Sequence, residues 1–152
     1  ALVGQNYGAL KFERIKEIYD KTIVIGITAM IIGGTIIYLL SGIVMGFFTD
    51  DPEQIYYGSQ YLKIAAFIGP VYPIFFISGA LFQGLKKAHY QTAINLLRMI
   101  IFPLIFLTIG VKYFDINFRE MFLILLVINW IFGLLVLFFS RRLITQILSK
   151  DN

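Results

Sequence analysis

The sequence has no cysteine, one histidine and few charged residues, and these shortages exclude several classes of protein. Without cysteine there is no disulfide framework and no thiolate metal site. Charged residues make up 14% of the 152 residues, whereas a soluble domain has roughly 25%. Hydrophobic residues make up 59%, and the mean hydropathy is +0.81. The composition therefore indicates an integral membrane protein.

Four apolar runs are long enough to cross a hydrocarbon layer of ~30 Å at a rise of ~1.5 Å per helical residue. We predict membrane spans over residues 22–48, 62–85, 90–112 and 120–141. Residues 1–8 are predicted to be the end of an earlier span, and we expect the chain to be a fragment of a longer protein. The predicted fold class is an all-α membrane bundle of four complete spans plus that end.

Two amphipathic segments are predicted to lie on the membrane surface. In residues 10–21, the apolar side chains of Phe12, Ile15 and Tyr19 recur at helical spacing. The second segment is the basic tail over residues 142–152. Between the first two spans, the sequence Asp51-Pro52 predicts a helix start.

Basic residues are unevenly divided between the two ends of the predicted spans. Nine lie at one end, and three lie at the other end together with five acidic residues. The positive-inside rule assigns the first end to the cytoplasm. We therefore predict a multi-pass protein of the cell membrane with a cytoplasmic C-terminus and no nucleic-acid partner. The nine are Lys11, Arg14, Lys16, Lys21, Lys86, Lys87, Arg141, Arg142 and Lys150; the three are Lys63, Lys112 and Arg119.

Prolines and glycines interrupt the predicted spans. Pro70, Pro73 and Pro103 each remove a backbone donor, so we predict kinks there, either hinges or fixed bends. Gly42 and Gly46 form a Gly-x-x-x-Gly pair that favours close helix packing. Packing within the chain is the more common use of this pair, and a dimer face is the alternative.

Arg98 is the one charged residue well inside a predicted span. A charge at the membrane centre costs at least ~2.5 kcal/mol, so it needs a partner or an escape route. It is either a tether to polar groups such as Gln83 or Asn95, or a gate on the inner face of a cavity. The candidates for a substrate pathway are Tyr38, Tyr72, Ser78, Gln83, Asn95 and Arg98. The alternative role for most of them is interhelical hydrogen bonding.

Two stretches carry a family signature. The first is Val3–Lys16, VGQNYGALKFERIK, and the second is Phe82–Pro103, where Gln83-Gly84 and Lys86 are followed by Arg98 and Pro103. Together they resemble the C-terminal half of a multidrug and toxic compound extrusion (MATE) transporter. The resemblance implies two lobes of six helices, of which this chain would hold the end of the eighth helix and the ninth to twelfth. It also implies export of organic cations by alternating access, in exchange for sodium or protons.

The chain departs from that family in one respect. Some members use an acidic residue in the tenth helix for ion coupling, but Ile64–Leu85 contains none. We therefore expect the coupling ion to bind in an N-terminal lobe outside this sequence. The expected partners are the lipid bilayer, that lobe and a small cationic substrate, with no cofactor and no metal site.

Three other functions compete with export. A related lipid-linked oligosaccharide flippase would be expected to have more basic residues facing its cavity than Arg98 alone. An intramembrane enzyme would need paired aspartates, a Ser/His set or a histidine cluster within the spans, so no catalytic residue is predicted. An assembly subunit could pack through Gly42 and Gly46, but polar interruptions in nearly every span favour a moving cavity.

Overall fold

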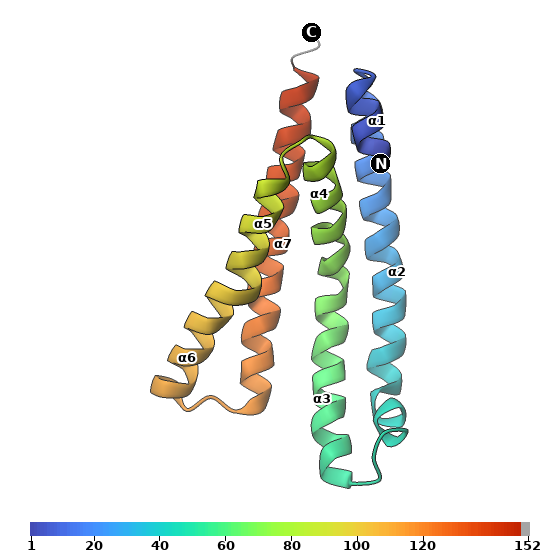
Figure 1. Cartoon of the computed structure of the whole chain (residues 1–152). Helices are drawn as coiled ribbons and strands as arrows, with labels where there is room; N and C mark the ends of the chain where they lie inside the picture. Colours follow the sequence, from blue (N-terminus) through green and yellow to red (C-terminus); the bar gives the residue numbers. More distant parts are fainter. Residues whose placement is uncertain (150–152) are drawn as a thin grey trace.

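The computed structural model describes residues 1–149, and within them the chain forms helices and turns without a β-strand. Four helical rods in this part are long and apolar enough to cross a membrane, which confirms the predicted all-α membrane fold. The rods are α2 (Phe12–Gly46); α3 (Pro52–Ile68), η1 (Gly69–Val71) and α4 (Tyr72–Gly84); α5 (Ala88–Leu96), η2 (Leu97–Ile101) and α6 (Phe102–Phe114); and α7 (Phe118–Leu148). The short helix α1 (Leu2–Gly8) precedes them (Figure 1).

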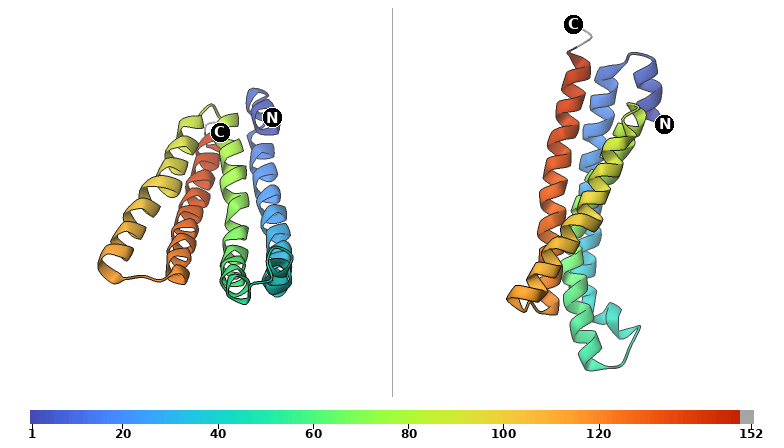
Figure 2. Two further views of the ribbon diagram at one scale, coloured as in Figure 1. Left: turned by 60° about the horizontal axis from the view of Figure 1, so that its bottom comes forward. Right: turned by 60° about the vertical axis from the view of Figure 1, so that its left-hand side comes forward.

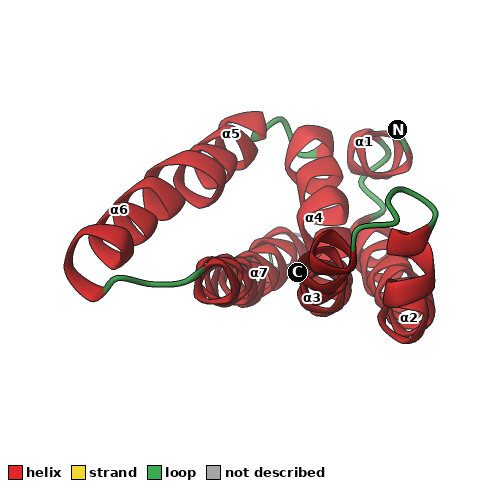
Figure 3. Cartoon of the chain, turned by 90° about the horizontal axis from the view of Figure 1, so that it is seen from below, coloured by secondary structure: helices red, strands yellow, loops and turns green. Residues whose placement is uncertain are grey.

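The rod formed by α3 and α4 occupies the centre of the bundle. Seen along the bundle in Figure 3, α3 lies between α2 and α7. The rod formed by α5 and α6 diverges from α7 toward the loop that joins α6 to α7 (Figures 1 and 2). The α1–α2 turn, the α4–α5 turn and the end of α7 lie at one end of the bundle, and the two remaining loops lie at the other (Figure 1).

This arrangement separates the charged residues by end. The α1–α2 turn, which contains Lys11, and the α4–α5 turn, which contains Lys86 and Lys87, lie at the first end, while the two loops that contain Asp51 and Asp115 lie at the second. The grouping agrees with the one used to predict the cytoplasmic side, which itself stays a prediction. Lys150 lies outside the described residues.

The predicted interfacial segment 10–21 and the span 22–48 are not separate, because α2 is continuous from Phe12 to Gly46. No glycine or proline breaks the first turns of α2. The Lys21 Nζ atom lies 2.6 Å from Glu17 Oε1, and this i,i+4 pair stabilises the helix next to the expected boundary between residues 21 and 22. The apolar stripe of this segment, including Ile15, Tyr19 and Ile23, is buried in the protein core. The stripe therefore packs against other helices of the protein, and the depth of this segment in the membrane stays a prediction.

The predicted C-terminal tail is likewise not a separate helix. Helix α7 continues without a break to Leu148, with Leu143 and Ile144 buried. Residues 150–152 of the tail lie outside the described part of the chain. The span expected over residues 120–141 and the first part of the tail therefore form one helix.

Side-chain caps set the starts of two rods. The Asp51 carboxylate accepts the Glu53 backbone N–H at 2.9 Å, which confirms the predicted start of α3 at Pro52. The rod expected over residues 62–85 therefore begins about three turns earlier. At the start of α7, Asn117 and Glu120 form a capping box, each side chain accepting the other's backbone N–H.

The three prolines lie at changes in helical pitch. Pro70 cannot donate to the Ala66 carbonyl, and the chain tightens into the 3-10 turn η1, where the Tyr72 N–H bonds to the Gly69 carbonyl. The neighbouring Phe67 carbonyl accepts the Trp130 Nε1–H of α7 at 3.0 Å. Just before Pro103 the helix widens instead into the π turn η2, where the Phe102 N–H bonds to the Leu97 carbonyl.

Glycines in α2 and α7 allow both helices to approach residues 66–73 of the central rod closely. A Cβ atom at Gly34 would lie 2.8 Å from the Ala66 carbonyl oxygen, and one at Gly26 would lie 2.8 Å from Pro73 Cβ. A Cβ atom at Gly133 of α7 would lie 2.5 Å from Val71 Cγ1. Real Cβ atoms do not come this close, so we call Gly26, Gly34 and Gly133 the glycine notches.

The predicted packing pair Gly42 and Gly46 does not form the close approach. A Cβ atom at Gly42 would lie 3.9 Å from Ser59 Oγ, an ordinary contact, and one at Gly46 would meet nothing within 4 Å in the described chain. On α2 it is Gly34 that meets the backbone of α3, because an added Cβ atom there would lie 2.8 Å from the Ala66 carbonyl oxygen. The spacing of Gly42 and Gly46 therefore did not identify the glycine of α2 that meets the α3 backbone.

Replacing Gly34 with leucine is expected to destabilise the bundle by about 1–3 kcal/mol, because the side chain cannot fit against the Ala66 carbonyl. The matched control is Gly33→Leu at the adjacent position, where an added Cβ meets nothing within 4 Å. The control is expected to change stability by no more than about 0.5 kcal/mol. Thermal unfolding of the purified protein in detergent measures both, and equal losses would contradict the close approach at Gly34.

Candidate functional site

Arg98 lies in the π turn η2 and is buried, with 7% of its surface exposed. Its guanidinium carbon lies 3.9 Å from the centroid of the Phe75 ring and 5.6 Å from that of the Tyr72 ring, both in α4. Its Nη1 atom donates to Asn129 Oδ1 of α7 at 2.6 Å. A desolvated cation–π contact is worth ~2 kcal/mol. Arg98 thus joins three of the four rods through one side chain.

The partners of Arg98 are neutral. Asn129 Nδ2 donates to the Leu125 carbonyl at 2.8 Å, which orients the amide so that its oxygen faces the guanidinium. No carboxylate pairs with Arg98 within residues 1–149, and its buried Nε atom has no hydrogen-bond partner there. An amide oxygen and aromatic faces therefore hold the cation without an ion pair.

The tether partners suggested from the sequence, Gln83 and Asn95, are not the ones found. The Asn95 side chain accepts a hydrogen bond from Gln91 Nε2 at 3.4 Å. Gln83 is exposed and lines a shallow depression beside α1 with Gly4. The partner is Asn129, 31 residues further along the chain. Sequence spacing reveals neighbours on one helix, and this pair joins two helices.

Among the other predicted pathway residues, Tyr72 faces Arg98, whose guanidinium carbon lies 5.6 Å from the centroid of its ring. The Tyr72 ring is 37% exposed and stacks beside Phe76. Tyr38 is exposed on α2, where it meets Phe67 edge-on at 5.7 Å. The predicted residues therefore do not form one continuous lining in the described part of the chain.

Ser78 belongs to a buried polar cluster rather than to an exposed surface. The Tyr19 hydroxyl lies 2.9 Å from Ser78 Oγ, linking α2 to α4. Ser140 of α7 is also fully buried, and its Oγ has no hydrogen-bond partner among the described residues. The contact between Tyr19 and Ser78 agrees with interhelical hydrogen bonding, the alternative to a substrate role for Ser78.

The two signature stretches meet at the end of α4. A Cβ atom at Gly84 would lie 2.6 Å from Val3 Cγ1 and 3.0 Å from the Gly4 backbone nitrogen. Glycine at position 84 therefore allows α1 to rest against α4. Residues that are about eighty positions apart in the sequence thus form one contact.

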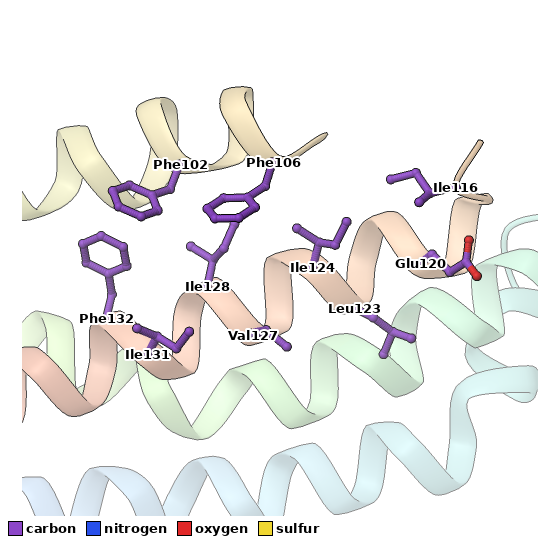
Figure 4. Close-up of a pocket in the computed structure, with 10 residues that line it drawn as sticks. All are labelled: Phe102, Phe106, Ile116, Glu120, Leu123, Ile124, Val127, Ile128, Ile131 and Phe132. Atoms are coloured by element: carbon purple, nitrogen blue, oxygen red, sulfur yellow. The ribbon is translucent and has the colours of Figure 1, made fainter. Parts of the chain in front are cut away.

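An apolar groove of about 480 Å³ lies between α6 and α7. Figure 4 shows Phe102 and Phe106 of α6 facing Ile128 and Phe132 of α7. Its polar end is Glu120, whose carboxylate is already engaged with the Asn117 N–H at 2.8 Å. Within residues 1–149, no group of three or more histidine or acidic side chains could hold a metal ion.

These features define a multi-pass helical membrane protein with a proline-broken central rod and a buried arginine between its rods. The family model for MatE matches residues 1–109. The chain belongs to the MatE family, as its two signature stretches predicted.

The fold is similar to that of a MOP superfamily transporter from Pyrococcus furiosus, described as having a binding pocket of reverse polarity that suggests a different function. The TM-score is 0.87 at 19% sequence identity, and the match covers 95% of this chain and 33% of that chain. This chain thus spans about a third of the length of that transporter. No curated protein sequence matches it.

A double-mutant cycle tests the contact between Arg98 and Asn129. Arg98→Leu and Asn129→Leu are each expected to lower the free energy of unfolding, because a hydrogen bond to a charged group contributes about 1.5–3 kcal/mol. The double variant is expected to lose about 1–3 kcal/mol less than the sum of the single losses. Asn95→Leu combined with Arg98→Leu is the matched control, for which additive losses are expected. Additive losses for the pair with Asn129 would refute the contact.

Proposed function

We propose that this chain forms part of the C-terminal lobe of a secondary active exporter for multiple drugs and other organic cations. The observation that carries the proposal is the MatE family match over residues 1–109. The exporter works by alternating access and antiport, with sodium or protons as the coupling ion. It acts together with an N-terminal lobe of the same protein, which supplies the carboxylate for that ion.

Tyr72 is the residue of this chain best suited to contact a cationic substrate. Its exposed ring stacks beside Phe76 and offers an aromatic face, which attracts organic cations. Arg98 is a positioning residue in this scheme. By holding η2 against Phe75 and Asn129, it fixes the rod of α5 and α6 to the rest of the lobe. This is the tether role, and we prefer it to a gate.

The second candidate function is a flippase for lipid-linked oligosaccharides. One observation favours it: Arg98, the one charge well inside the spans, is a cation without a carboxylate partner in the described residues, which suits an anionic cargo. Arg98 is a single such residue, whereas such a flippase is expected to have more basic residues facing its cavity. We therefore place export of organic cations first.

The proposal is tested with the full-length gene product in cells exposed to a fluorescent lipophilic cation. Expression is expected to lower accumulation of the cation, and dissipating the sodium or proton gradient is expected to abolish that effect. Unchanged accumulation, with flipping of a lipid-linked oligosaccharide in vesicles, would instead support the second candidate.

The role of Tyr72 is tested in the same assay. Tyr72→Leu is expected to raise the KM for the cation about two- to fivefold, the loss expected for an exposed cation–π contact. Tyr72→Phe keeps the ring face and is expected to retain the parental KM. Equal KM values for the two variants would exclude a contact through the aromatic face.

A further inference from the structure

A second groove, which we call the α2–α3 groove, has a volume of about 370 Å³. It lies along α2 and α3 and reaches Trp130 of α7. The groove passes the glycine notch at Gly34 and the bend at Pro70. Its lining is largely apolar: Ile27, Ile31, Gly34, Thr35, Tyr38, Ala66, Phe67, Pro70 and Trp130.

The walls of the groove are fixed by specific contacts. Trp130 Nε1 donates to the Phe67 carbonyl at 3.0 Å, so the indole is held against α3 with its polar atom satisfied. The Tyr38 and Phe67 rings pack edge-on at 5.7 Å across α2 and α3. The groove is therefore a preformed apolar slot whose shape suits an extended hydrocarbon chain.

A lysine lies beside one end of the slot. Lys63 precedes Phe67 by one helical turn, and its Nζ atom lies 5.8 Å from the centroid of the Tyr38 ring. It is the only charged residue between Glu53 and Lys86. Among residues 1–149, no carboxylate lies within salt-bridge distance of Lys63. Lys63, which is half-buried as a residue, thus has an aromatic face beside its ammonium group but no anion among the described residues.

Aromatic side chains cluster between the start of α3 and Lys63. Tyr57 packs edge-on against Phe118 at 5.9 Å, and Tyr61 packs against Phe122 at 4.8 Å. Belts of tyrosine and tryptophan mark the boundary between headgroups and acyl chains. Lys63 follows Tyr61 by two residues, and a lysine just inside such a belt extends its ammonium toward the phosphates.

We propose that the α2–α3 groove binds an anionic phospholipid, with one acyl chain in the apolar slot and the phosphate at Lys63. The groove between α6 and α7 does not fit this ligand, because its polar end is the carboxylate of Glu120. The proposal rests on the membrane-spanning fold and is independent of the proposed export of cations.

Trp130 provides the readout, because it is the only tryptophan in the sequence and it lines the groove. The full-length gene product is placed in nanodiscs of phosphatidylcholine containing a small fraction of phosphatidylglycerol with brominated acyl chains, which quench tryptophan fluorescence on contact. A parallel sample contains the same fraction of brominated phosphatidylcholine. Subtracting the signal of a Trp130→Phe variant isolates the contribution of Trp130.

Brominated phosphatidylglycerol is expected to occupy the groove about fivefold above its mole fraction, the enrichment that ~1 kcal/mol per lysine near the membrane surface gives. Lys63→Gln is expected to reduce it to the level of brominated phosphatidylcholine, and Lys63→Arg is expected to keep it. The matched control is Lys112→Gln, because Lys112 also lies over a tyrosine, at 5.5 Å from the Tyr113 centroid, but belongs to α6, which contributes no residue to the groove. This control is expected to retain the full enrichment.

Three results would overturn the proposal. Equal quenching by the two brominated lipids would remove the headgroup preference. Enrichment that persists in Lys63→Gln would remove the role of Lys63. Absence of quenching by either lipid would show that another part of the protein covers the groove. Thermal unfolding of each variant confirms that it is folded. If Lys63→Gln does not fold, the enrichment measured in Lys63→Arg decides the outcome.

Discussion

The arrangement of the bundle depends on the fit of the broken central rod into the glycine notches of α2 and α7. Pro70 frees the carbonyl of Ala66, and the Gly34 backbone lies directly against it. On the opposite side, Gly133 leaves room for the fully buried Val71. Both α2 and α7 take their positions from this broken part of the central rod. Its packing therefore sets where Trp130 lies, the shape of the α2–α3 groove and the distance from α4 to Asn129.

The surrounding lipid explains why small residues and polar pairs, and not buried leucines, hold the helices of this bundle together. Lipid tails are as apolar as leucine, so burying leucine between membrane helices gains little, and close packing with hydrogen bonds must hold the helices together. The many exposed apolar side chains of α2, such as Ile25, Leu39 and Ile43, agree with such a medium. Tyr19 with Ser78, and Arg98 with Asn129, are the polar counterparts that join one helix to another.

Local patterns predicted local structure well. Apolar run length identified four spans, Asp51-Pro52 identified a helix start, and the two signature stretches identified the MatE family. The errors came from contacts between distant segments. The amphipathic stripe at Ile15 and Tyr19 looks the same whether it faces lipid headgroups or a neighbouring helix, and the spacing of Gly42 and Gly46 does not reveal where α3 bends. Asn129 could not be assigned to Arg98, because no rule of spacing joins residues on different helices.

The most direct test of this account is solid-state NMR of isotope-labelled protein in lipid bilayers, measuring through-space correlations of Gly34. The account predicts a cross-peak between Gly34 Cα and the Ala66 carbonyl carbon, and another between Gly133 Cα and the Val71 side chain. A spectrum in which both glycines correlate with lipid alone would contradict the packing of the broken rod between α2 and α7.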